Sequence, residues 1–418
     1  MAAGGLPAVA VLGIGGVGGV LAASLATAGR CRLTLVARGA AHRRLCRDGL
    51  TVQLHEGHTV HCRPDAVLDA EGLAQPPPQD IVLVATKSHQ LTAAIPALLP
   101  LLGPETVVVP CVNGLPWWYF HGTGGREEGL QLQSVDPGGA LHTAVSPERV
   151  LGTVGMTSGD LDRSEGGIWR SKWPTERNHI TVGDPVAGGG RSARTDAVAA
   201  LFCSEQVPVR IEVCDDIRSA VFDKLLINAS LNTISSLTHT DCGQVVGDPQ
   251  LRALLTAMVA EVEQVAAALD PPPSLQWSAA KIVEIYTGQF GLRTSMMQDL
   301  QARRELERAG IVVGAPTLAA DAWLTPRCPP RPWLSVPHGR HAQRCSLRRM
   351  HLWSWVRRSV SRRRCCRQAP PCSRRWTPPP EGCRDLAARR WGDDTGSSAA
   401  GRRDPPRGRL VAVAARDR

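Results

Sequence analysis

The chain has 418 residues, 43% of them hydrophobic, which is enough for two or three domains that each bury a core. Its net charge of +10 is unevenly distributed: residues 325–418 hold 23 arginines and 6 acidic residues, so residues 1–324 are mildly acidic. The basic character therefore gives no reason to expect that a folded domain binds nucleic acid. Thirteen cysteines without a CxxC spacing indicate neither a disulfide framework nor a zinc site, and they favour the cytoplasm.

The first predicted elements are a buried strand at 8–12, a glycine-rich turn at 13–19 and a helix at 20–28. Residues 1–28 carry no charge, but their glycines and this strand–turn–helix order argue against a membrane span. Further buried strands are expected at 33–37, 80–86 and 106–111, with a helix near 90–102. Strands that alternate with helices predict an α/β fold with an open parallel sheet.

The later part of the chain changes character. Residues 151–183 predict extra strands, with VLGTVGM and HITVGD as an antiparallel set, and the sequence becomes helical after Ile217. A long helix is expected from Leu251 to Leu269, ended by three prolines. Residues 325–418 lack apolar periodicity and repel themselves, so we expect a disordered tail. That tail binds nucleic acid through its arginines, has no function, or is the product of an out-of-frame reading of a GC-rich gene.

The glycine-rich turn carries the first functional motif. Gly13, Gly15 and Gly18 form GxGxxG between a strand and a helix, and Ile14, Gly16 and Val17 complete the loop. In this context the pattern predicts that a dinucleotide pyrophosphate binds at the N-terminus of the helix. Arg38 stands where a site for NAD places an acidic residue, so it favours NADP, together with Arg43 or Arg44; the alternative is an ordinary solvated arginine.

A second motif lies in the helical part. Lys224, Asn228 and Asn232 are spaced four apart in an otherwise apolar segment, so a helix would place them along one stripe. They form either an internal hydrogen-bond network or the wall of a site for a small polar substrate. Other polar side chains follow predicted strands or lie on a late helix: Lys87, Asn113, Ser295 and Glu307. Ligands of open parallel sheets bind at the carboxyl ends of the strands, where Lys87 and Asn113 are expected.

Seven segments occur in a familiar order: GIGGVGG, LVAR, VATK, VNGLPWWYF, SVDPGG, KLLINASLNTISSLT and SMMQDLQARRELE. From Ala8 to Ala315 the chain resembles the ketopantoate reductase (2-dehydropantoate 2-reductase) family. The resemblance implies an N-terminal Rossmann-type NADP-binding domain (1–212), an all-α substrate domain (213–324) and the tail (325–418). It also implies a cytoplasmic oxidoreductase, monomeric or homodimeric, that reduces 2-dehydropantoate to pantoate with NADPH.

The resemblance also implies roles for single residues. Lys224 is the general acid that protonates the keto oxygen, and Glu307, with Glu305 as the alternative, lies near it and orients the substrate. Asn228, Asn232 and Ser295 bind the substrate. Asn113 lies by the nicotinamide and substrate, and Lys87 lies on the cofactor side.

The sequence departs from the family pattern in four places: Thr233 replaces a proline, Arg303 replaces a glycine, one residue is inserted after Glu307, and the closing helices are cut short after Ala315. Three alternatives therefore stay open: another NADP-linked 2-hydroxy-acid dehydrogenase, a non-catalytic NADP-binding protein, and a nucleic-acid binder that acts through its tail. His55 and His61 are expected on one face of a strand, a spacing that suits no common metal site, so we predict none.

Overall fold

The computed structural model describes residues 5–162, 167–186, 188–204, 206–308 and 310–311. All of them belong to one compact unit, Met1–Trp353. The predicted disorder of residues 325–418 falls outside the described residues. Within them, no helix combines the length and the apolar character needed to cross a membrane.

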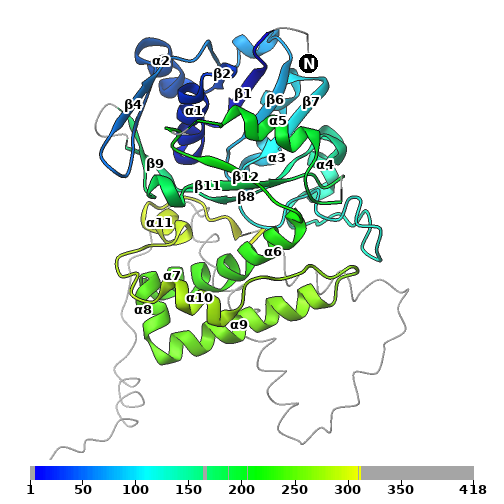
Figure 1. The fold of residues 1–418 in the computed structure, drawn as a ribbon, viewed down its shortest axis with the longest axis vertical. Helices are drawn as coiled ribbons and strands as arrows, with labels where there is room; N and C mark the ends of the chain where they lie inside the picture. The colour runs from blue at the N-terminus through cyan, green and yellow to red at the C-terminus, as the bar shows by residue number, and fades with distance from the viewer. Residues whose placement is uncertain (1–4, 163–166, 187, 205, 309, 312–418) are drawn as a thin grey trace, which may run out of the picture. The chain divides into compact units, whose positions relative to one another are not determined.

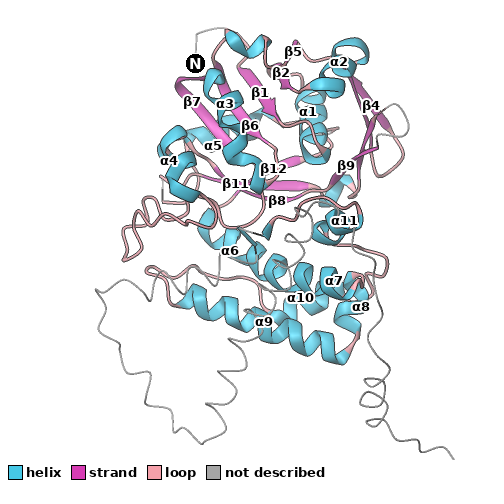
Figure 2. Ribbon diagram, turned by 180° about the vertical axis from the view of Figure 1, so that it is seen from behind, coloured by secondary structure: helices cyan, strands magenta, loops and turns pink. Residues whose placement is uncertain are grey.

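A five-stranded parallel sheet forms the first part of the structure, in the order β5-β2-β1-β6-β7 (Figure 2). Its strands are β1 (Ala8–Leu12), β2 (Arg32–Val36), β5 (Ala66–Leu68), β6 (Gln79–Val84) and β7 (Leu102–Pro110). Both faces of the central strand are covered: Val9 and Val11 join one apolar core, and Ala10 and Leu12 join the other. Burial on both faces explains why these strands are continuous apolar runs in the sequence.

Helices cover the two faces of this sheet. Helix α1 (Gly16–Ala28) contributes to the core of Val9 and Val11, and α3 (Leu91–Leu98) to that of Ala10 and Leu12. Helix α2 (Gly39–Asp48) follows β2. Helix α1 starts four residues earlier than predicted, inside the glycine-rich turn, because glycine provides no side chain that would mark the boundary.

Two smaller sheets follow. One has the order β4-β3-β10-β9, with bounds Leu50–Gln53 (β3), Thr59–Cys62 (β4), Gly159–Asp162 (β9) and Ile168–Ser171 (β10). The other has the order β12-β11-β8, with bounds Gly152–Met156 (β8), His179–Gly183 (β11) and Arg210–Val213 (β12). The antiparallel pairing predicted for VLGTVGM and HITVGD is confirmed as β8 with β11. Two short helices, α4 (Ala140–Ala144) and α5 (Ala193–Leu201), belong to this part of the chain.

The prediction that His55 and His61 share one face of a strand was wrong. His55 and His58 lie in the turn between β3 and β4, and His61 lies on β4, where its Nδ1 is 3.0 Å from Thr51 Oγ1. The strand pattern does not reach across this segment because Gly57, with φ +91°, turns the chain back on itself.

From Ile217 onward the described elements are helical, and α6 to α10 lie together in Figure 1. They are α6 (Ile217–Ile227), α7 (Thr233–Thr238), α8 (Cys242–Gly247), α9 (Pro249–Ala267), α10 (Ala279–Tyr286) and α11 (Ser295–Gln301). A π-helical turn, Asn228–Asn232, joins α6 to α7. The apolar face of these helices continues the core on the α3 side of the parallel sheet. The predicted order, a Rossmann-like sheet followed by helices, is confirmed.

Candidate functional site

Two glycines of the glycine-rich turn have different roles. A Cβ on Gly18 would lie 2.0 Å from the carbonyl oxygen of Gly13, so this glycine lets α1 pack against the end of β1. A Cβ on Gly15, the N-cap of α1, would meet no atom within 4 Å. Gly15 therefore borders open space at a helix N-terminus without a side-chain cap, where backbone N–H groups and the helix dipole favour an anion.

The other residues of this loop are more enclosed. Ile14 is buried, and its carbonyl accepts a hydrogen bond from Trp169 Nε1 at 3.4 Å. Gly16 lies against β9, because its Cβ would be 1.9 Å from the carbonyl oxygen of Gly159, and Val17 is half-buried. Of the loop residues predicted to bind the cofactor, Gly15 has the clearest open space.

The arginines that follow β2 differ in their surroundings. Arg38 is exposed and is the N-cap residue of α2, and Arg43 is also exposed. The guanidinium of Arg44 instead lies over the ring of Trp169, 4.5 Å from its centre, in a cation–π contact. Arg38 and Arg43 are thus available to a phosphate in a way that Arg44 is not.

A charged cluster joins the end of β6 to the last described helix. Lys87 Nζ donates to Asp299 Oδ2 at 2.9 Å and to Glu307 Oε2 at 3.4 Å, and the Ser88 N–H donates to Glu307 Oε1 at 3.0 Å. Arg304 Nε also donates to Asp299, at 2.8 Å. Both carboxylates are buried. Burial lowers the pKa of Lys87, but the charges of Glu307 and Asp299 outweigh it, so the net shift is upward and Lys87 stays charged.

This cluster shows which groups Glu307 binds. Its carboxylate pairs with Lys87 and accepts from the Ser88 N–H. That Glu307 also lies near Lys224 stays a prediction. Of the two candidate glutamates, Glu307 is 5% exposed, whereas Glu305 has a side chain that is 51% exposed and lies 3.9 Å from His89 Nε2. The buried position identifies Glu307 as the glutamate that belongs to the cluster.

The polar stripe begins on α6 and continues into the π-helical turn. Lys224 is half-buried, and the acceptor that the described residues offer its ammonium is Met156 Sδ, at 3.1 Å. No carboxylate within the described residues pairs with it, and burial lowers the pKa of Lys224 from 10.5 to about 8. Asn232 Nδ2 donates to Asn228 Oδ1 at 3.0 Å, and both amides are buried. The Asn228–Asn232 pair is therefore an internal hydrogen bond, yet Asn228 Nδ2 has no partner.

The remaining candidates lie on loops or helix ends. Asn113 is half-buried in the loop after β7, and the next residue, Gly114, packs against Gly310. Ser295 is exposed at the first position of α11, whose N-cap is Thr294. No hydrogen bond ties the side chain of Asn113 or Ser295 to another described residue, so both are available to a ligand.

Shielded polar atoms without partners gather in the same segments. In the described part of the chain they include atoms that follow β6 or β8, or that lie on the π-helical turn or α7: Thr86 Oγ1, Ser88 Oγ, His89 Nδ1, Thr157 Oγ1, Asn228 Nδ2, Thr233 Oγ1 and Ser236 Oγ. The segments are joined by contacts: Gly13 lies against Thr86, Lys87 binds Asp299, and Lys224 binds Met156. Because buried polar groups normally have partners, this concentration indicates a place for a polar ligand.

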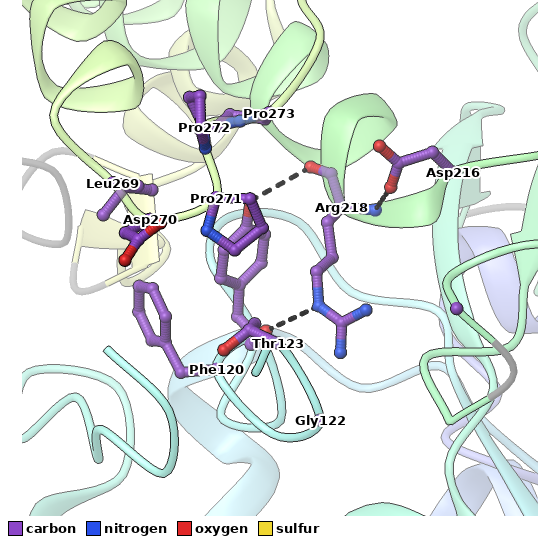
Figure 3. A pocket seen from close by; sticks show the side chains of 12 residues that line it. Phe120, Gly122, Thr123, Asp216, Arg218, Leu269, Asp270, Pro271, Pro272 and Pro273 are labelled. Atoms are coloured by element: carbon purple, nitrogen blue, oxygen red, sulfur yellow. Dashed lines mark hydrogen bonds between the residues drawn. The ribbon is translucent and has the colours of Figure 1, made fainter. Parts of the chain in front are cut away.

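A pocket elsewhere offers no comparable chemistry. It lies between the loop of Tyr119–Thr123, the start of α6 and Leu269–Pro273 (Figure 3). Arg218 donates to the backbone carbonyls of Tyr119, Pro185 and His121, and the Asp216 carboxylate accepts from the N-terminus of α6. These two charged groups are thus engaged in holding the fold.

Comparisons with known proteins identify the family of this chain. The family model of ketopantoate reductase PanE/ApbA matches residues 9–116, and its C-terminal model matches residues 216–323. A 2-dehydropantoate 2-reductase from Mesorhizobium japonicum is 37% identical over 329 residues, which cover 76% of this chain and 95% of the relative. The chain belongs to the ketopantoate reductase family.

Other family members are more distant. A 2-dehydropantoate 2-reductase from Halobacterium salinarum is 28% identical, over 70% of this chain and 84% of the relative. A crystal structure of a candidate ketopantoate reductase from Ralstonia solanacearum MolK2 has a TM-score of 0.67 and 30% identity, and the match covers 77% of this chain and 94% of that one. The predicted family resemblance is confirmed, and the C-terminal match runs beyond Ala315 into residues outside the described ranges.

The sequence did not single out three residues that the structure places among the candidates. Asp299 lies in the SMMQDLQ segment, and its position in a segment already recognised was a signal that could have been used. Met156 ends a predicted strand and Thr157 follows it, but a methionine and a threonine there carry no distinctive pattern. Their relevance depends on contacts that only the folded chain shows.

Proposed function

We propose that this protein reduces 2-dehydropantoate to pantoate with NADPH, and that Lys224 is the general acid. The observation that carries the proposal is the half-buried Lys224 ammonium. No carboxylate of the described residues pairs with it, and the π-helical turn and α7 that follow its helix hold buried amide and hydroxyl groups for which the described residues offer no partner. Family membership supports the reaction class.

The chemistry of Lys224 follows from its surroundings. A pKa of about 8 keeps most of the amine protonated at neutral pH while making it a better acid than an exposed lysine. The ammonium donates a hydrogen bond to the keto oxygen of the substrate and transfers its proton as negative charge develops on that oxygen. Shielding from water strengthens this interaction, because a charge is screened less where the effective dielectric constant is low. No anion of the described residues competes with the substrate for the ammonium.

The proposal assigns the other polar groups to binding. Asn228 turns its unpartnered Nδ2 to an oxygen of the keto acid, with Asn232 fixing the orientation of the Asn228 amide through Oδ1. Ser295 binds the substrate from the start of α11, and Asn113 lies by the nicotinamide. Glu307 holds Lys87 and the Ser88 N–H, so it orients the end of β6 on the cofactor side.

The residues present fit a dinucleotide. Gly15 leaves room at the N-terminus of α1 for a pyrophosphate, and Arg38 offers an exposed guanidinium for a 2′-phosphate. The nicotinamide, when bound, supplies the hydride that adds to the keto carbon. Arg38→Ala is expected to raise the Kd for NADPH about tenfold or more and leave the Kd for NADH nearly unchanged, which fluorescence titration of both cofactors measures.

The proposal also covers location and assembly. We propose a cytoplasmic enzyme that is a monomer or a homodimer; a ketopantoate reductase from Staphylococcus aureus is described as dimeric. Light scattering of the purified chain tests the assembly. Nucleic-acid binding, if detected, is expected to disappear when residues 325–418 are deleted.

The test is NADPH oxidation by the purified protein with 2-dehydropantoate, pyruvate and an aromatic 2-keto acid, each also with NADH. Rapid turnover of 2-dehydropantoate with NADPH is expected. Preference for a different keto acid would replace the substrate assignment with another 2-hydroxy-acid dehydrogenase. NADPH binding without turnover of any keto acid would show a non-catalytic NADP-binding protein.

A further inference from the structure

The acceptor that faces Lys224 has an unusual chemistry. The Lys224 ammonium donates to the thioether of Met156 at 3.1 Å, and a thioether is a weak acceptor. An ammonium shielded from solvent is usually held by a carboxylate or by amide oxygens. Here the contact orients the side chain but satisfies its charge poorly.

The fold fixes this contact through the register of a strand against a helix. Gly152, Val154 and Met156 share one face of β8 because side chains alternate along a strand. At one end of that face Gly152 lies against Ile217, where a Cβ would be 2.7 Å from Ile217 Cγ1. At the other end Met156 meets Lys224. The four residue steps from Gly152 to Met156 span about 13 Å along the strand, and the seven steps from Ile217 to Lys224 span about 10 Å along the helix, so β8 and α6 run side by side over this length.

Among the described residues, no charged group on or around α6 pairs with the ammonium. The elements packed on α6 include β8, β11, α9 and the π-helical turn. Strand β8 and the π-helical turn carry no titratable side chain, and those on β11 and α9 are His179, Arg252, Glu261 and Glu263. On α6 itself, Asp223 accepts from the backbone N–H groups of Gln276 and Trp277. Within the described residues none of these groups pairs with Lys224.

We propose that Met156 is a positioning residue for Lys224: its sulfur holds the ammonium in the direction of the reacting carbonyl and yields it when the keto oxygen of the substrate arrives. The inference rests on the proposed function of Lys224. A weak acceptor suits this task because an oxygen in its place would stabilise the ammonium, make it a poorer acid and compete with the substrate.

Two substitutions at one position separate these effects. Met156→Leu keeps an apolar side chain of similar size but removes the acceptor, and Met156→Gln keeps the length but supplies an amide oxygen. Met258→Leu, in the buried face of α9, is the matched control for replacing a core methionine.

The first measurement needs no turnover. The chain has four lysines, so NMR of protein labelled with ¹⁵N at the lysine side chains gives a simple spectrum, in which Lys224→Arg assigns the Lys224 signal. The pKa of Lys224 is expected to rise by about one unit in Met156→Gln and to stay at or below the wild-type value in Met156→Leu. The control variant is expected to titrate like the wild type.

The second measurement is steady-state reduction of 2-dehydropantoate. Met156→Leu is expected to lower kcat about tenfold with an unchanged Kd for NADPH, and Met156→Gln is expected to raise KM for the keto acid and shift the alkaline limb of the pH profile upward. Unchanged kcat, pH profile and Lys224 pKa in both variants would overturn the proposal, even if their thermal stability falls. The pKa of Lys224 could change as expected in Met156→Gln and Met156→Leu while the protein turns over no keto acid. That result would support the positioning of Lys224 by Met156 and reject the proposed function.

Discussion

Gly15 provides a test of the cofactor site that separates binding from folding. Its backbone is extended, with φ −84° and ψ −159°, a conformation that alanine adopts readily. The added methyl of Gly15→Ala would meet no protein atom within 4 Å, so we expect the free energy of unfolding to change by less than about 0.5 kcal/mol. The methyl would instead occupy the space assigned to the pyrophosphate.

The expected loss of affinity follows from one hydrogen bond. A backbone N–H bound to a charged phosphate oxygen contributes about 1.5–3 kcal/mol, and a methyl that pushes the phosphate away forfeits about that amount. The Kd for NADPH is therefore expected to rise about 10- to 100-fold. Fluorescence titration with NADPH measures the Kd, and urea denaturation of the free protein measures the stability.

Gly18→Ala is the counterpart of this variant. Its methyl would lie 2.0 Å from the carbonyl oxygen of Gly13, so the backbone has to move, and we expect a loss of about 1–3 kcal/mol or more in the free energy of unfolding. A Gly15→Ala protein that binds NADPH with wild-type affinity would refute the assignment of the open space. A Gly15→Ala protein that is destabilised as strongly as Gly18→Ala would refute the conclusion that Gly15 borders open space.

Three further variants test the site and its support. Arg303 has φ +55° where α11 ends, so Arg303→Gly is expected to raise the free energy of unfolding by about 1 kcal/mol; an unchanged midpoint in urea would contradict this strain. Asp299→Asn removes a buried carboxylate from Lys87 and Arg304, whose side chains are 38% and 44% exposed and can be hydrated, so a loss of only about 1–2 kcal/mol is expected; equal stability would show that the cluster contributes nothing. Lys224→Met removes a shielded ammonium whose pKa is lowered to about 8, so it is expected to raise stability at pH 7 by about 2–3 kcal/mol, measured by urea denaturation. Because the unfolded chain binds the extra proton between pH 8 and the ordinary lysine pKa of 10.5, that gain should shrink across this window, and a gain independent of pH would contradict the assignment.

The parts of the fold with strong local signals could be predicted from the sequence. The strand predicted at 8–12 is β1 with the same bounds, because a strand buried on both faces is an unbroken apolar run between glycines. The antiparallel pair of β8 and β11 was predicted from a glycine-rich, strand-like pattern and is confirmed. Boundaries inside glycine-rich or mixed segments, such as the start of α1, carry no such signal.

Contacts between distant segments could not be predicted in this way. Lys87 and Asp299 are 212 residues apart, and nothing in either segment specifies that they pair. The sequence also did not predict that Glu307 binds Lys87, 220 residues away, in a buried polar cluster. The contact of Lys224 with Met156 likewise depends on how β8 and α6 are aligned, which follows from the packing of Gly152 on Ile217.

The most direct test of the proposed function compares the wild type with Lys224→Ala in one assay of NADPH oxidation by 2-dehydropantoate, with the Kd for NADPH measured on the same samples. The wild type is expected to turn over, and the variant to lose about 10²- to 10⁴-fold in kcat while it binds NADPH with unchanged affinity. Turnover by Lys224→Ala at the wild-type rate would contradict the role of Lys224 as the proton donor.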